Sequence, residues 1–213
     1  MSNNRLNGAA QEGNIDLLYT LIQEDPNILD YTDSTPFVDT PLHIAATFGH
    51  LHFATEIMRL KPSFAWKLNQ QGFTPIHLAL QHGHNRIVLH FVDINKDLVR
   101  VKGREGITPL HFVTQIGKVD LLVHFLLLCP DSIKDVNVRS ETVLHIAVRN
   151  QQYEAVQVLN GWLKINDEKG AMYLEETVLN WKDDAGNTIL HVSVLTNNLQ
   201  CTRNSGILLT GKS

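Results

Sequence analysis

The stretch Thr40-Pro41-Leu42-His43-Ile44-Ala45-Ala46-Thr47-Phe48-Gly49-His50 recurs along the chain and decides its fold. Related segments, each with a histidine three residues after a threonine, begin at Thr74, Thr108, Thr142 and Thr188. The first three intervals between these threonines are 34 residues long, and the last is 46. A fixed period of this size is typical of proteins built from stacked repeats.

Each copy has the features of a helix start. A threonine hydroxyl can cap the first turn, and proline suits the first helical position because its missing N–H is not needed there. An apolar helical stripe follows at 13, 14, 17 and 18 residues after the threonines that precede Thr188. Glycines stand two residues before a threonine, where a tight turn needs positive φ, at Gly72, Gly106 and Gly186. The sequence therefore predicts units of helix, turn, helix and extended, hairpin-like loop.

A more polar version of the pattern precedes Thr40. Leu6, Ala9 and Ala10 match the residues after Thr40 at an offset of 36, and Asn4 stands where the capping threonine would be. Asparagine also caps helices well. We therefore predict an N-terminal cap unit over about residues 1–36, with Asn4 at the start of its first helix.

Composition and charge narrow the classes of function. The chain is 43% apolar and 19% charged with a net charge of −4, which argues against nucleic acid or an anionic membrane as the main partner. Cys129 and Cys201 are too few for a disulfide framework and fit a reducing cytosol. The N-terminus lacks the apolar core of a signal peptide, and the longest apolar run, residues 121–129, is too short to span a membrane. We expect a soluble, cytoplasmic chain.

The motif Thr-Pro-Leu-His-x-Ala, the glycine nine residues after the threonine and the Gly-x-Thr turn resemble ankyrin repeats. The resemblance covers about residues 1–197 and implies an all-α ankyrin-repeat solenoid of helix-turn-helix units joined by β-hairpin-like loops. The segments 62–65, 97–101 and 103–109 further resemble the plant accelerated-cell-death and bian-da type ankyrin proteins. That family carries a cytosolic ankyrin array followed by a C-terminal membrane domain and is linked to innate immune signalling. This sequence shows no counterpart of the membrane domain.

The repeat count predicts the domain organisation. We expect an ankyrin-repeat array over residues 1–198, with units that start near Thr40, Thr74, Thr108, Thr142 and Thr188. Twelve extra residues precede the last unit, and we expect an insertion at about 161–180 that forms a prolonged second helix, a turn and a short amphipathic return. Small or polar residues then occupy the places where the last unit needs large apolar ones, at Cys201, Thr202, Ser205 and Gly206. Residues 199–213 are therefore predicted to be an irregular tail and an incomplete last repeat, produced by truncation, splicing or a change of reading frame.

No pattern in the sequence favours an active site. The segment 206–213 matches the phosphate-loop spelling, but no helix follows it and no parallel sheet is available, so we interpret it as a coincidence. Neither cysteine has a histidine partner in a known motif. We predict that the chain is not an enzyme and binds no cofactor.

The histidines are interpreted as structural, and no metal site is predicted. Five of them lie one repeat apart, at His43, His77, His111, His145 and His191, and ligands so far apart cannot converge on one ion. The ankyrin resemblance implies that each ties its helix start to the neighbouring loop. The histidines near the turns between helices are expected to face solvent, at His50, His52, His82 and His84.

Surface recognition remains as the predicted activity. Stacked repeats present an extended face made of loop tips and first helices. The candidate protein-binding residues on this face are Phe48, Gln71, Gln81, Lys102, Arg104, Glu105, Gln115, Arg139 and Arg149. Aromatic and arginine side chains are frequent interface anchors, although for any one of these residues an ordinary surface position is the favoured interpretation.

The leading hypothesis is a non-enzymatic protein–protein interaction module. By resemblance it serves plant immune or stress signalling, in the cytoplasm or at the cytosolic side of the plasma membrane through a partner. The alternative is a truncated form of a membrane-anchored ankyrin signalling or transport protein. A nucleotide-hydrolysing enzyme, based on segment 206–213, is the weakest alternative. The sequence does not indicate the identity of the partner or the oligomeric state.

Overall fold

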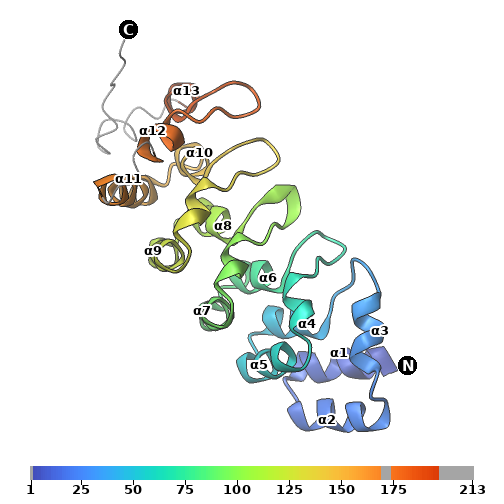
Figure 1. Cartoon of the computed structure of the whole chain (residues 1–213). Coiled ribbons are helices and arrows are strands. Elements are labelled where there is room, and N and C mark those ends of the chain that lie inside the picture. The colour runs from blue at the N-terminus through green and yellow to red at the C-terminus, as the bar shows by residue number, and fades with distance from the viewer. Residues whose placement is uncertain (1, 169–173, 197–213) are drawn as a thin grey trace. The chain divides into compact units, whose positions relative to one another are not determined.

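The computed structural model describes residues 2–168 and 174–196, and every regular element in these two ranges is helical (Figure 1). The chain divides into two compact units, Met1–Arg104 and Glu105–Ser213. Among the described residues, no helix is both long and apolar enough to cross a bilayer. The expected irregular tail, 199–213, and the phosphate-loop spelling within it lie outside the described residues.

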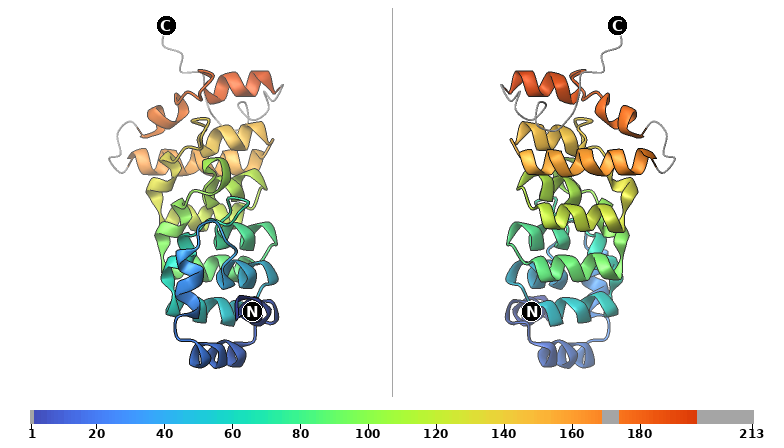
Figure 2. Two further views of the ribbon diagram at one scale, coloured as in Figure 1. Left: turned by 90° about the vertical axis from the view of Figure 1, so that its right-hand side faces the viewer. Right: turned by 90° about the vertical axis from the view of Figure 1, so that its left-hand side faces the viewer.

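The first unit holds two rows of helices. Its elements are α1 (Ser2–Glu12), α2 (Ile15–Glu24), α3 (Ile28–Ser34), α4 (Pro41–Phe48), α5 (Leu51–Leu60), the 3₁₀ helix η1 (Pro62–Trp66), α6 (Pro75–Gln81), α7 (Asn85–Ile94) and the 3₁₀ helix η2 (Lys96–Arg100). Helices α1, α4 and α6 pack in one row, and α2, α5 and α7 in the other. Figure 2 shows α5 and α7 side by side in its right-hand view.

The second unit repeats this arrangement. Its elements are α8 (Pro109–Gln115), α9 (Val119–Leu128), the 3₁₀ helix η4 (Pro130–Lys134), α10 (Val143–Arg149), α11 (Tyr153–Glu168), α12 (Leu174–Leu179) and α13 (Ile189–Leu195). A further short 3₁₀ turn, η3 (Arg104–Gly106), falls where the two units meet in the sequence. Helices α8, α10 and α13 form one row, and α9 packs against α11. In the region where we expect an insertion, α11 runs for 16 residues, and α12 packs on it.

The helix starts and the core follow the repeat period. Helices α4, α6, α8, α10 and α13 each begin at the residue after a repeat threonine, which has extended backbone. The predicted apolar stripe is buried throughout α5, α7 and α9. Fully burying one large apolar side chain contributes about 1.5–3 kcal/mol, so these stripes are what hold the two rows together. The predicted positive φ is present at Gly72, Gly106 and Gly186, with values of 80°, 71° and 80°.

One local prediction is wrong. Asn4 does not start the first helix, because α1 begins at Ser2 and neither proline nor glycine interrupts residues 2–7. The structure also has short 3₁₀ helices between the second helices and the loops, which the sequence pattern does not predict. Pro62 and Pro130 each occupy the first position of a 3₁₀ helix, where a fixed φ and a missing N–H are tolerated. Buried side chains such as Phe64 and Ile133 anchor these 3₁₀ helices to the core.

Candidate protein-binding surface

The repeat histidine joins the start of one helix to the loop that follows the repeat. In the first unit, His43 Nδ1 lies 3.2 Å from the Thr40 amide nitrogen and 2.8 Å from its hydroxyl, and Nε2 lies 3.0 Å from the Phe73 carbonyl oxygen. Burial lowers the pKa of His43 to about 4, so the ring is neutral at pH 7. A neutral ring with its proton on Nε2 donates to Phe73 and accepts at Nδ1, which satisfies all three contacts.

The second unit repeats the same bonds. His111 Nε2 lies 3.2 Å from the Glu141 carbonyl oxygen, and His145 Nε2 lies 3.2 Å from the Asn187 carbonyl oxygen. Burial also lowers the pKa of His145. Because both ring nitrogens are engaged, these histidines have no lone pair to offer a metal ion. No group of three potential metal ligands occurs within residues 2–168 and 174–196.

The loops between repeats, here called fingers, are shaped by a buried amide or carboxylate. In the finger 67–73, the Asn69 side-chain oxygen accepts from the amides of Gln71 and Phe73 at 3.0 and 2.9 Å. The backbone N–H of Asn69 donates to the Phe73 carbonyl oxygen at 2.9 Å, which closes the loop. Asn137 and Asp183 make the equivalent bonds in the fingers 135–141 and 181–187. These hydrogen-bonded fingers carry two of the candidate binding residues, Gln71 and Arg139.

Sequence reasoning missed these finger-forming residues. Asn69, Asn137 and Asp183 each lie five residues before a repeat threonine, and this spacing is the signal that could have found them. The pattern is broken by Gly103, which occupies the same place before Thr108. A Cβ atom on Gly103 would lie 2.8 Å from His77 Cε1, so glycine is needed there for the close approach of the ring.

All five candidate residues of the first unit are exposed, but they do not form one set. Gln71, Lys102 and Arg104 lie in the loops between repeats, and Gln81 ends α6 at the seventh residue after its threonine. Phe48 lies one position later in its repeat, and its ring stacks on His50 with a centroid distance of 6.4 Å and an interplanar angle of 10°. The structure therefore separates Phe48 from the fingers and places it at the turn between α4 and α5.

The candidates of the second unit, Glu105, Gln115, Arg139 and Arg149, are also exposed. Arg139 Nη2 lies 3.7 Å from Glu105 Oε2, and both side chains are more than half exposed. An exposed pair of this kind contributes at most about 1 kcal/mol, so a partner can displace it. Arg139 is therefore available for binding.

Arg149 is held by buried acidic groups. Its Nη2 lies 2.7 Å from Glu141 Oε1 and 3.7 Å from Asp183 Oδ2, and both carboxylate side chains are only 3% exposed. Asn137 Nδ2 donates to the other Glu141 oxygen at 2.7 Å. Burial raises the pKa of the Asp183 carboxyl, but hydrogen bonds from Asn187 and Ala185 outweigh this effect and hold it below its usual value. Removal of Arg149 would leave two buried carboxylates without their cation, so this residue joins two fingers.

The helix–turn–helix units, the threonine–histidine pair at each first helix and the hydrogen-bonded fingers define an ankyrin-repeat protein. The family model for ankyrin repeats (3 copies) matches residues 6–100 and 89–167, and the chain belongs to this family.

Among individual proteins, the chain is 58% identical over 188 residues to Ankyrin repeat-containing protein BDA1 of Arabidopsis thaliana. The alignment covers 88% of this chain and 44% of the relative, so the chain spans less than half of that protein's length. The resemblance to the bian-da type proteins is thereby confirmed.

A solved structure has the same fold. A chain of the complex of the Bd0816 predatory endopeptidase from Bdellovibrio bacteriovorus with immunity protein Bd3460 matches with a TM-score of 0.67. The match covers 95% of this chain and 97% of that chain at 23% identity, which shows the fold alone.

Proposed function

We propose that this chain is a non-enzymatic module that binds a partner protein through its fingers. The observation that carries the proposal is the set of exposed basic residues in the loops between repeats, Lys102, Arg104 and Arg139. In the finger 135–141, the bonds of Asn137 fix the backbone on both sides of Arg139. A rigid backbone lowers the entropy lost when a side chain is immobilised by a partner. The exposed arginines are also the side chains most often found to anchor interfaces.

The biological setting is proposed from the similarity to the Arabidopsis relative. The two chains are 58% identical over 188 residues, and this similarity is what supports a shared setting. We propose a role in plant immune or stress signalling, in the cytoplasm or at the cytosolic side of the plasma membrane through a partner. The net charge of −4 leaves the basic fingers as local features on an otherwise acidic chain, which favours a partner with an acidic patch.

The test is charge reversal at the fingers. The variants Arg104→Glu and Arg139→Glu are used separately and together to capture proteins from plant extract, and the captured proteins are quantified by mass spectrometry. The control is Lys118→Glu, which reverses an exposed charge at the turn before α9, away from the fingers. We expect the double variant to recover about tenfold less of the specific partner, since reversal turns attraction into repulsion, while the control recovers it fully. If the two single variants and the double variant all recover as much of the partner as the control does, the fingers are not the binding site.

A second candidate function is that of a membrane-anchored signalling or transport protein whose ankyrin part is represented here. The observation that favours it is that the chain spans 44% of the length of the Arabidopsis relative. Fractionation of the native gene product separates the two candidates. Recovery with membranes after a high-salt wash, together with transcripts that encode an apolar C-terminal region, supports the second candidate.

A further inference from the structure

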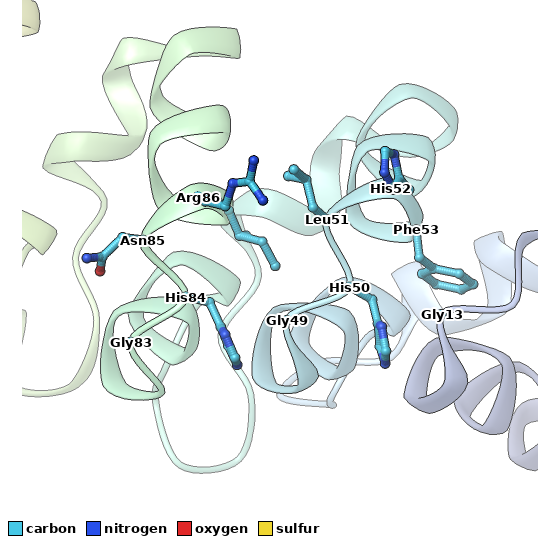
Figure 3. Close-up of a pocket in the computed structure, with 11 residues that line it drawn as sticks. Gly13, Gly49, His50, Leu51, His52, Phe53, Gly83, His84, Asn85 and Arg86 are labelled. Carbon is cyan, nitrogen blue, oxygen red and sulfur yellow. The ribbon is translucent and has the colours of Figure 1, made fainter.

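A cleft of about 500 Å³ lies along the turns between the paired helices of the first unit. It is lined by the turn glycines Gly13, Gly49 and Gly83 and by side chains from the first turns of α5 and α7 (Figure 3). Helix α4 runs from the end of one loop at Thr40 to the turn at Gly49, so this cleft is at the opposite end of the helix from the fingers. It is therefore a surface distinct from the proposed finger site.

Two histidines form fixed walls of the cleft. His50 Nε2 lies 2.7 Å from the Gln11 carbonyl oxygen, and His84 Nε2 lies 2.9 Å from the Thr47 carbonyl oxygen. Each ring lies against a glycine of the preceding turn, where an added Cβ would come within 2.7 Å of the ring. The expectation that His50 and His84 simply face solvent is therefore wrong, since each is half-buried and joins its turn to the preceding repeat.

Two further aromatic rings stack on the histidines of the cleft. Phe48 stacks on His50, and His82 stacks on His84 with a centroid distance of 6.3 Å and an interplanar angle of 10°. Phe48 is 52% exposed, although a large aromatic ring gains from burial. These rings offer flat surface to a partner's backbone or apolar side chains.

One cationic side chain, Arg86, lies at the cleft in a chain that is negatively charged as a whole. Arg86 and His52 are exposed at its edge, and Figure 3 shows Arg86 extending towards Leu51 of the neighbouring turn. No aspartate or glutamate is among the residues that line it, whereas the chain carries a net charge of −4. Arg86 is therefore not neutralised from within the cleft.

The helices beside the cleft add to the positive potential. Neither α5 nor α7 has an acidic residue in its first turn or a side-chain cap. Helix α2, in contrast, has both, because Asn14 caps it and Asp16 lies in its first turn. The partial positive charge at the start of a helix is thus offset in α2 and not in α5 or α7.

We propose that this cleft binds an acidic segment of a partner protein. Its carboxylates pair with Arg86 and accept a hydrogen bond from the exposed His52 ring, and its backbone packs against the rings of Phe48 and His82. Charge complementarity selects this occupant, since a basic segment would be repelled and a purely apolar one would leave Arg86 without a partner.

The test uses a fluorescently labelled hexaglutamate peptide and the full chain, with binding followed by fluorescence anisotropy at low salt. We expect the Kd to rise about tenfold in Arg86→Glu and in His52→Glu, because each change places a carboxylate at an exposed position and repels the acidic peptide. A matched variant, Arg104→Glu at the finger, should bind within about twofold of the wild type. Binding should also weaken as salt is raised, because exposed charges are screened. Thermal unfolding of each variant shows that it is folded.

The opposite results are equally definite. Binding that is unchanged in both Arg86→Glu and His52→Glu overturns the proposal, as does equal binding of a hexaglutamine peptide. A loss confined to Arg104→Glu would assign acidic peptides to the fingers and leave the cleft without this role. If inorganic phosphate binds at the cleft and the peptide does not, the acidic segment is overturned as the ligand and a phosphate group takes its place.

Discussion

Helices α4 and α13 begin with the same threonine–histidine pair in different surroundings. In both, the threonine hydroxyl lies 2.8 Å from the histidine Nδ1, which also accepts from the threonine backbone N–H, at 3.2 Å in α4 and 3.3 Å in α13. Leu42 and Ala46 of α4 are completely buried, whereas Leu190 of α13 is half-buried and Val194 is 64% exposed at the equivalent positions. Their local geometry is therefore the same, and their packing is not.

The two histidines differ in the same way. His43 is buried and reaches the Phe73 carbonyl, which belongs to the next finger. His191 is exposed, and within residues 2–168 and 174–196 its Nε2 has no hydrogen-bond partner. The comparison teaches that the motif fixes the helix start, while the following repeat supplies burial and the acceptor. In a stack of repeats, most of the stabilisation therefore comes from the interface between neighbours.

The largest expected difference concerns removal of the histidine. His43→Ala should lower the free energy of unfolding of the first unit by about 2–4 kcal/mol, because it leaves three polar groups without partners and opens a cavity. His191→Ala should cost about 1 kcal/mol or less, since water already reaches its ring. Amide hydrogen exchange in α4 and α13 reports the two helices separately. Equal losses at the two sites would show that the motif stabilises on its own, without the neighbouring repeat.

The next effect is a dependence on pH. The pKa of His43 is about 4 in the folded chain, against about 6.5 when unfolded. Between these values the unfolded chain binds a proton that the folded chain does not, so the contribution of His43 is complete above about pH 6.5 and falls as the pH falls. The slope is about 1.4 kcal/mol per pH unit for one group, or about 2 kcal/mol of stability lost at pH 5.

Urea unfolding at several pH values from 7 to 5 measures this slope. Carboxyl groups contribute little in that range because they titrate at lower pH. His145, whose pKa is also lowered, adds a loss of the same sign in the second unit. His43→Gln is the control. Its free energy of unfolding should fall less steeply with decreasing pH than that of the wild type, because one fewer proton is taken up on unfolding. Parallel curves for the two proteins would mean that His43 is not kept neutral by burial.

Much of the fold can be predicted from the repeat pattern, because each feature of the pattern acts locally along the chain. A capping threonine, the proline after it and an apolar stripe at helical spacing all act within one or two turns, and they place α4, α6 and α8 at the correct residues. The same period could not show that Pro62 starts a 3₁₀ helix, because that depends on the burial of Phe64 against the core.

The candidate surface was less accessible to sequence reasoning. Arg149 and Gln81 occupy equivalent repeat positions in the sequence, but only the structure shows Arg149 paired with Glu141 and Asp183. Side-chain direction decides such pairs, and spacing in the sequence does not reveal it. The cleft was missed for a related reason, since His50 and His84 bond to carbonyls 39 and 37 residues earlier in the chain.

The smallest expected effect isolates the cap itself. Thr108→Ala should lower stability by about 0.5–2 kcal/mol through loss of the helix cap, while Thr188→Ala should cost only a few tenths of a kcal/mol. Thr108 is completely buried and Thr188 is half-buried, although each hydroxyl lies 2.8 Å from its histidine. Thr108→Ser keeps the hydroxyl and serves as the control in urea unfolding of the second unit. If the two alanine variants lose the same amount, the cap acts through its local hydrogen bonds alone. A larger loss at Thr108 means that its strength depends on exclusion of water by the neighbouring repeat, because a buried group left unpaired costs more than one that water can reach.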